Sequence, residues 1–171
     1  NLGSQLSAFN LKYQNSTVES LYQGSKVYSD GKLNHDLYNV DSLTAKKAAS
    51  GRGICSFVGF NYKGTEMPTE PRTVFYDWLY LNAMVETYGT SLDLSEYDCF
   101  TDIQATVDID ACQARSVCIY TLMQELECFD LLDDIDKFKE WHSLHVESNF
   151  VPEKIYDTFV SRTDKSTYSV I

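Results

Sequence analysis

The sequence predicts one mainly α-helical domain with a small β element, a fold class that three observations support. Residues with hydrophobic side chains make up 43% of the 171 residues and include 12 Tyr and 9 Phe, a composition typical of a packed core. Helical periodicity extends over long segments of the second half, and no composition shift marks a boundary. We therefore expect a compact single domain over residues 1–160, followed by a polar tail over residues 161–171.

The first elements of the chain are expected to be short. Residues 6–13 alternate loosely between apolar and polar side chains, which favours a short strand. Ser16 is followed three residues later by Glu19, and this capping-box pattern predicts a helix over about 17–28. The apolar run 54–60 is either a buried strand or a loop packed on the core. The further helices are expected over residues 42–49 with Asp41 as N-cap, 73–88, 110–129, 131–146 and about 152–160.

Charge and composition exclude several classes of protein. The net charge of −11 excludes a protein that holds nucleic acid by phosphate neutralisation alone, although a pocket for one nucleotide stays compatible with it. No apolar stretch is long enough for a membrane span, and the first residues do not resemble a signal peptide, so we expect a cytoplasmic protein. The five cysteines include no CxxC pair and the three His have no metal spacing, so we expect reduced thiols, no metal and no cofactor.

A polar row on the first long helix is the best functional clue. Glu19 and Gln23 are four residues apart, and Gln23 and Lys26 are three apart, so a helix would stack the three on one face. A carboxylate, an amide and an amine in one row suit recognition of a polar ring or sugar. The alternative is a capping Glu beside a solvated Lys. Gly24 would allow another backbone or a ligand to approach closely.

A carboxylate among aromatic residues forms a second candidate. Asp77 lies next to Tyr76 and Trp78, and a ring stacked on Trp beside a carboxylate is a common way to hold a base or sugar. The alternative is that Asp77 pairs locally while the aromatic residues fill the core.

A lone cation at the start of a mostly apolar helix forms a third candidate. Arg115 follows Gln113 and the segment that contains Asp102, and its guanidinium suits bidentate binding of a phosphate. The alternative is an ion pair of Arg115 with Asp102 or Asp110. Arg52 is a further phosphate candidate on a loop.

Residues 18–26 resemble the helix signature of the NADAR (YbiA-like) superfamily, in which a Glu, an aromatic–Gln pair and a Lys recur at this spacing. Residues 45–48 resemble its Ala-rich second helix, and residues 76–84 resemble its Asp-Trp helix leading to a Met. The family's Trp-Gly pair is missing, and residues 108–115 stand in place of its Gly-Lys-Asn-type helix start. The resemblance is that of a divergent member with a YbiA-like helical fold.

The resemblance implies an N-glycosidase that hydrolyses an ADP-ribosyl or related ribosyl-nucleobase bond, including reversal of guanine ADP-ribosylation as an antitoxin would perform it. Glu19 would protonate the leaving nitrogen, Lys26 would form a Schiff base with an opened sugar, and Asp77 would orient the ribose hydroxyls. The partner would be an ADP-ribose-type or ribosyl-nucleotide small molecule, carried on nucleic acid or not. The expected substrate-binding residues are Tyr22, Gln23, Trp78, Arg52, Asp102, Gln113 and Arg115.

Two alternatives belong to other functional classes. One is an inactive module that binds ADP-ribose or a nucleotide. The other is an interaction protein of phage defence or counter-defence, whose late acidic segment contacts a basic partner. That segment contains Asp130, Asp133, Asp134, Asp136 and Glu140, and its simpler interpretation is a solvated helix face.

Overall fold

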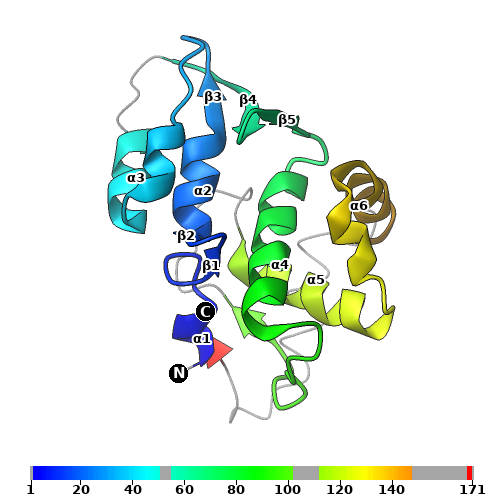
Figure 1. The fold of residues 1–171 in the computed structure, drawn as a ribbon. Helices are drawn as coiled ribbons and strands as arrows, with labels where there is room; N and C mark the ends of the chain where they lie inside the picture. The colour runs from blue at the N-terminus through cyan, green and yellow to red at the C-terminus, as the bar shows by residue number, and fades with distance from the viewer. Residues whose placement is uncertain (1, 51–54, 102–111, 148–168, 171) are drawn as a thin grey trace.

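The computed structural model describes residues 2–50, 55–101, 112–147 and 169–170, and it confirms a mainly helical fold with small β elements. Figure 1 shows helices α2 (Val18–Ser25) and α4 (Val74–Tyr88) near the middle of the molecule, with α3 (Ser42–Ser50) packed on the outer side of α2. Helices α5 (Gln113–Glu125) and α6 (Ile135–His142) pack against α4. The remaining elements are α1 (Leu2–Gln5), β1 (Lys12–Tyr13), β2 (Ser16–Thr17), η1 (His35–Asn39), β6 (Phe100–Thr101), η2 (Phe129–Asp133), η3 (Ser143–Glu147) and β7 (Ser169–Val170).

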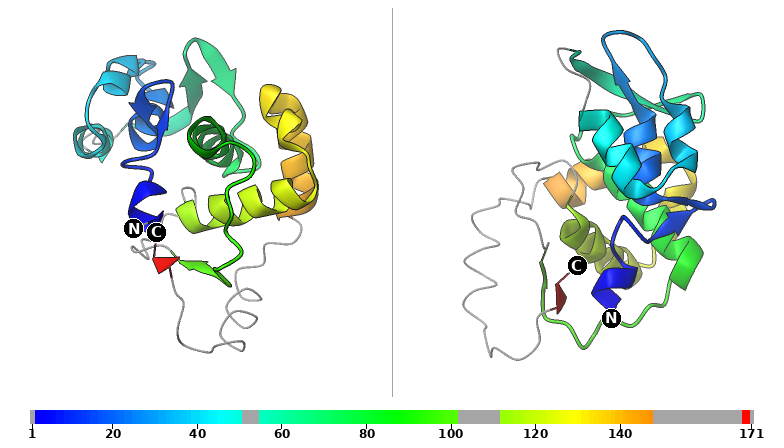
Figure 2. Two further views of the ribbon diagram at one scale, coloured as in Figure 1. Left: turned by 60° about the horizontal axis from the view of Figure 1, so that its bottom comes forward. Right: turned by 90° about the vertical axis from the view of Figure 1, so that its left-hand side faces the viewer.

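Helix α4 forms the centre of the core, as its apolar residues on every side predicted. Its Val74, Leu79 and Leu81 side chains are fully buried, and the helix ends at Gly89, whose φ of 73° suits a glycine. This confirms the helix predicted over residues 73–88. The left view of Figure 2 shows α4 between α2 and the α5–α6 pair, and α4 contacts all three helices.

Helix α2 is buried along its whole length, but its ends differ from the prediction. Thr17, and not Ser16, caps the helix by accepting a hydrogen bond from the Ser20 N–H. The helix ends at Ser25, and Lys26 has an extended backbone with φ −65° and ψ 130°. Lys26 therefore does not belong to the helix, because its backbone begins a strand. The tertiary pairing of that strand outweighs the local helical pattern.

Strands β3, β4 and β5 lie at one end of α2 and form a small antiparallel sheet in that order, whereas β1–β2 and β6–β7 are separate pairs. Strand β3 (Lys26–Tyr28) pairs Lys26 with Phe60 of β4 (Phe57–Tyr62), and β4 pairs with β5 (Thr65–Met67). The run 54–60 is thus only partly a buried strand, since Phe57 and Val58 are exposed. Of the strand expected over 6–13, only β1 forms.

Gly24 explains how α2 is fixed beside η1. A Cβ atom at this position would lie 2.5 Å from Cδ1 of Tyr38 and 3.2 Å from the carbonyl oxygen of Asn34. The Tyr38 ring cannot easily move away, because its hydroxyl is bonded to Ser25 and to the Asn61 carbonyl. The close approach predicted at Gly24 is therefore made by the protein's own backbone and ring.

The later helices are shorter than expected. The helix expected over 110–129 forms as α5 within the described residues, and that over 131–146 forms as α6 followed by η3. The helix expected over 152–160 and most of the tail lie outside the described residues. No helix among the described residues is long and apolar enough to cross a membrane.

Candidate functional site

The site begins with a buried pair of polar side chains on α2. Glu19 is 6% exposed and Gln23 is 8% exposed, and Gln23 Nε2 donates a 3.0 Å hydrogen bond to Glu19 Oε1. Glu19 has no capping role, since its carboxylate faces Gln23 and Thr17 caps the helix. Among the described residues, Gln23 is the one side chain that hydrogen-bonds to Glu19. The carbonyl oxygen of Gln23 is also buried and has no hydrogen-bond partner in the described part of the chain.

These contacts leave two buried groups that can still interact with a ligand. A carboxylate can accept about four hydrogen bonds, and the contact with Gln23 uses one of them. A buried carbonyl oxygen without a donor costs about 1–3 kcal/mol. The amide is oriented with its NH₂ group toward Glu19, so its carbonyl oxygen is the atom left without a donor. Both groups therefore favour binding a polar molecule that carries N–H or O–H donors.

Lys26 follows the last residue of α2 and is the first residue of β3, and its side chain contacts Tyr22 of α2. Its Nζ lies 4.6 Å from the centre of the Tyr22 ring, and the side chain is half-buried. A cation over a ring face is stabilised as the ammonium form. The prediction that Glu19, Gln23 and Lys26 share one face of a helix is therefore correct for the first two residues only. Lys26 lies just beyond the end of the helix, next to Tyr22.

Aromatic rings connect α2 to the central helix. The Tyr22 ring lies edge-on to Tyr76 of α4, with 5.0 Å between the ring centres, and 5.4 Å from the ring centre of Phe60 on β4. The Tyr22 ring therefore contacts side chains from both α4 and β4. It also contacts Lys26 of β3. Aromatic pairs of this kind contribute stability beyond their buried area.

Gln113 approaches Glu19 through the backbone of one residue. Its Oε1 accepts a 2.7 Å hydrogen bond from the Ala8 N–H, and the Ala8 carbonyl accepts a 3.0 Å bond from the Glu19 N–H. The first turn of α5 is thereby tied to the first turn of α2. This brings together two predicted site residues that are far apart in the sequence.

A second buried carboxylate lies on α4 and has partners on both oxygens. Asp77 is fully buried, and its Oδ1 accepts a 2.7 Å hydrogen bond from Ser116 Oγ. Its Oδ2 lies 2.9 Å from His142 Nε2 and 3.3 Å from Arg115 Nε. Arg115 Nη2 also donates to Oδ1, at 3.4 Å. Asp77 is thus paired, but with side chains 38 to 65 positions away rather than with local ones, and Arg115 is one of them. Asp102 and Asp110, the partners considered for Arg115, lie outside the described residues.

Asp77 and Arg115 stabilise each other's charged form. Burial alone raises the pKa of Asp77, but the Arg115 guanidinium and the hydrogen bonds of His142 and Ser116 outweigh it, so the pKa lies below its ordinary value. Burial lowers the pKa of Arg115, but the Asp77 carboxylate outweighs it, with smaller contributions from Cys112 and Tyr76. Asp77 is therefore ionised, and Arg115 carries its charge next to Tyr76.

The other predicted site residues are separate from this arrangement or outside the described residues. Trp78 is half-buried and donates a 3.0 Å hydrogen bond from its indole nitrogen to the Leu132 carbonyl, so one edge of its ring has a structural partner. Arg52 and Asp102 lie outside the described residues. The roles assigned to all these residues stay predictions.

The sequence pattern did not identify Ser116 or His142 as site residues. Ser116 and His142 are fully buried partners of Asp77, and His142 was considered only as a metal ligand. One signal could have found them. Asp77 lies on a helix that is apolar nearly all round, so a buried carboxylate there requires donors from neighbouring helices.

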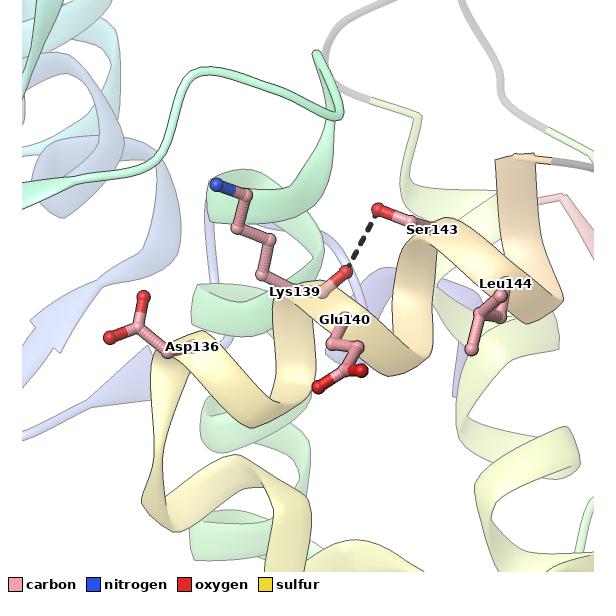
Figure 3. Close-up of a pocket in the computed structure, with 5 residues that line it drawn as sticks. All are labelled: Asp136, Lys139, Glu140, Ser143 and Leu144. Carbon is pink, nitrogen blue, oxygen red and sulfur yellow. Dashed lines mark hydrogen bonds between the residues drawn. The ribbon is translucent and has the colours of Figure 1, made fainter.

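Two hollows of the surface lie away from these residues. One, of about 410 Å³, is bordered by α6 and η3, and Figure 3 shows that its side chains come from one continuous helical segment. They include the 63% exposed Leu144, so this is an open surface feature. The other, of about 450 Å³, lies between residues 93–100 and α5.

One residue of the acidic segment 130–140 caps a helix. Asp134 is the N-cap of α6 and accepts hydrogen bonds from the Asp136 and Lys137 N–H groups. Its carboxylate also lies 3.7 Å from the Lys137 amine. Asp130, Asp136 and Glu140 are exposed, in agreement with a solvated helix face.

Comparison with known families gives one informative result. A family model described as DarT1-associated NADAR antitoxin matches residues 1–150 of the chain. The matched range includes every described element from α1 to η3, and with them both buried carboxylates. A search among curated proteins gave no match.

Proposed function

Because the chain belongs to the family of DarT1-associated NADAR antitoxins, we propose that it hydrolyses the N-glycosidic bond between an ADP-ribosyl group and a nucleobase. The membership confirms the NADAR resemblance noted for residues 18–26. The observation that carries the proposal is the Glu19 carboxylate, which is 6% exposed and accepts one described side-chain hydrogen bond. A carboxylate withdrawn from water with few partners is typical of a group that acts on a substrate.

Glu19 is the general acid of the proposed reaction. Its carboxyl group donates a proton to the leaving nitrogen of the base as the bond from the anomeric carbon breaks. The positive charge that develops on the sugar is stabilised by the resulting carboxylate. Water then adds to the anomeric carbon, and its proton returns to Glu19, so the products are the free base and ADP-ribose.

Gln23 assists in two ways. Its NH₂ group fixes one oxygen of Glu19, and its buried carbonyl oxygen accepts a hydrogen bond from an N–H or O–H group of the substrate. Binding the substrate would then remove the cost of an unpaired buried acceptor. This gives Gln23 a role in substrate recognition as well as in orienting the acid.

Lys26 has two possible roles that a conservative variant separates. As an ammonium over the Tyr22 ring it can hold a negatively charged or hydroxyl-bearing part of the substrate. As a neutral amine it can form a Schiff base with the ring-opened sugar, which water then hydrolyses. Lys26→Arg keeps the charge and removes the nucleophile, so hydrolysis retained in this variant supports the first role and hydrolysis lost supports the second.

The proposed biological purpose is removal of an ADP-ribosyl group from guanine, in nucleic acid or as a nucleotide. The family description supports an antitoxin role. The acidity of the chain favours recognition of the modified nucleotide itself over binding along a phosphate backbone.

The test is incubation of the pure protein with ADP-ribosylated guanosine, followed by mass spectrometry for free ADP-ribose. Glu19→Gln is expected to stop release, and Glu140→Gln, which makes the same change at an exposed position, is expected to leave it intact. Release that survives Glu19→Gln would remove Glu19 from the mechanism. Binding of ADP-ribose without release would support the inactive binding module, and neither release nor binding would favour the acidic interaction protein.

A further inference from the structure

An exposed aromatic ring lies at the start of β4, beside two other rings. Phe57 is 46% exposed, and its ring centre lies 4.8 Å from that of Phe60 and 6.3 Å from that of Tyr28 on β3. Both contacts are edge-on, with angles of 60° and 82° between the ring planes. The two neighbours therefore hold the Phe57 side chain in place while nearly half of it stays open to solvent. Phe57 and Tyr28 together are called the aromatic ledge below.

Strand pairing places the aromatic ledge on the same face of the sheet as Lys26. Lys26 pairs with Phe60 and Tyr28 pairs with Phe57, with one register shift between these two pairs. Lys26 and Tyr28 are two residues apart in β3, so their side chains project from one face, and directly paired residues of adjacent strands share a face. Phe60 packs on a ring of α2, so this face is turned toward the helix that carries Glu19.

The residues of this face continue the row of polar groups on α2. Nζ of Lys26 lies 4.6 Å from the centre of the Tyr22 ring, and Tyr22 lies in the turn of α2 that joins Glu19 to Gln23. At 1.5 Å per residue, the end of α2 lies about 9 Å along the helix axis from Glu19. Along α2 and β3 the chain therefore presents first a buried carboxylate, then an amine and then the aromatic ledge.

The charge of the chain is divided unevenly with respect to these groups. Residues 1–72, which contain all of them, have eight Lys and Arg against six Asp and Glu. Residues 73–171 have six Lys and Arg against nineteen Asp and Glu. An anionic ligand is therefore repelled less by the part of the chain that forms α2 and the sheet than by the remainder.

We propose that the aromatic ledge binds the adenine ring of an ADP-ribosyl ligand by stacking. In such a ligand the reacting ribose, the pyrophosphate and the adenine follow one another, which matches the order Glu19, Lys26 and Phe57. The guanine is attached directly to the reacting carbon, so its place is beside Glu19 and not beyond Lys26. Stacking of a base on an aromatic side chain needs no positive charge, so it suits a chain with a net charge of −11.

This inference rests on the proposed function for the identity of the ligand and on the first role described for Lys26, but its test needs no turnover. The measurement is the dissociation constant of ADP-ribose by calorimetry for the wild type, Phe57→Leu and Phe57→Trp. The first variant keeps an apolar contact with Phe60 but has no ring, and the second keeps a stacking surface. We expect Phe57→Leu to weaken binding about ten-fold and Phe57→Trp to retain it.

The matched control removes apolar surface of similar exposure elsewhere. Leu126, at the end of α5, is 49% exposed, and Leu126→Ala is expected to leave the affinity for ADP-ribose unchanged. Circular dichroism of all variants checks that they are folded. Equal affinities of Phe57→Leu and the wild type, or a wild type that does not bind ADP-ribose, would overturn the inference.

A series of three ligands identifies which base occupies the aromatic ledge. ADP-ribose, ADP-ribosylated guanosine and a short single-stranded DNA with the same modified guanine are compared in a Glu19→Gln background, which avoids turnover. Adenine as the occupant predicts that Phe57→Leu weakens the binding of all three by a similar factor. An effect confined to the DNA would overturn the inference and assign the ledge to a neighbouring base of the strand.

Failure of this inference and failure of the proposed function have different signatures. Binding of ADP-ribose that depends on Phe57, in a protein without hydrolytic activity, would support the inference and reject the proposed function. Hydrolysis that depends on Glu19, together with ADP-ribose binding that does not depend on Phe57, would support the proposed function and overturn the inference.

Discussion

Asp77 and Glu19, the two buried carboxylates in the described part of the chain, differ in how many hydrogen-bond donors surround them. Asp77 on α4 has three partner side chains distributed over both oxygens, whereas Glu19 on α2 accepts one described side-chain hydrogen bond, from Gln23. A saturated carboxylate stabilises its neighbours, and an unsaturated one keeps the capacity to bind and react. We therefore propose a positioning role for Asp77 and a chemical role for Glu19, although the sequence-based prediction had made both catalytic.

The largest effect on stability is expected at Asp77. Asp77→Asn leaves the buried Arg115 without its counter-charge, and breaking such a pair costs about 3–5 kcal/mol. Glu19→Gln should change the free energy of unfolding by less than about 1 kcal/mol, because the amide keeps one acceptor for Gln23. Urea unfolding of the two variants compares them directly. Equal losses of stability would contradict the distinction between the two carboxylates.

A smaller loss is expected where α2 is fixed to η1. Gly24→Ala should lower the free energy of unfolding by about 1–3 kcal/mol, since its Cβ would overlap the buried Tyr38 ring. Adding Tyr38→Leu should recover part of the loss by making room, and thermal unfolding of the single and double variants tests this. A Gly24→Ala variant as stable as the wild type would mean that α2 can shift, and that Glu19 is less firmly placed than described.

Gln23 provides a prediction about binding. Gln23→Met keeps the size of the side chain and removes both the support of Glu19 and the unpaired carbonyl. We expect a loss of stability of about 1–3 kcal/mol, because the buried Glu19 side chain loses its donor, and we expect ADP-ribosyl-guanosine to bind about ten-fold more weakly. Equilibrium binding in a Glu19→Gln background avoids turnover during the measurement. Unchanged affinity would remove Gln23 from substrate recognition.

The smallest effect concerns acid pH. Because the folded-state pKa of Asp77 is depressed, its contribution to stability is complete above its ordinary value of 3.8 and is lost as the pH falls through the lower folded value. The stability difference between the wild type and Asp77→Asn should therefore stay constant at neutral pH and shrink only below about pH 4. Unfolding followed at several pH values tests this, and a difference that already shrinks near pH 6 would contradict it.

Much of the fold follows from local signals in the sequence. The apolar surface of 73–88 and the following Gly89 predicted the central helix, and Asp41 predicted the start of α3, where Thr44 donates two hydrogen bonds to it. The end of α2 could not be predicted this way. Lys26 has a helical spacing to Gln23, and only the pairing of Lys26 with Phe60, far along the chain, makes it a strand residue.

The sequence predicted several residues of the candidate site, but it did not predict which side chains contact one another across helices. The Glu19–Gln23 contact follows from helical spacing alone. The pairing of Asp77 with Arg115, Ser116 and His142 depends on how α4, α5 and α6 pack, and these residues are 38 to 65 positions apart. No local pattern contains that information.

The most direct test of the account measures kcat and the ADP-ribose dissociation constant for Glu19→Gln and Asp77→Asn in parallel. The account predicts that Glu19→Gln lowers kcat by about 10²–10⁴-fold while ADP-ribose binds as in the wild type. Asp77→Asn, measured at a temperature where it stays folded, should mainly weaken ADP-ribose binding and keep most of its kcat. The reverse result, with chemistry lost at Asp77 and binding lost at Glu19, would contradict the assignment of the two carboxylates.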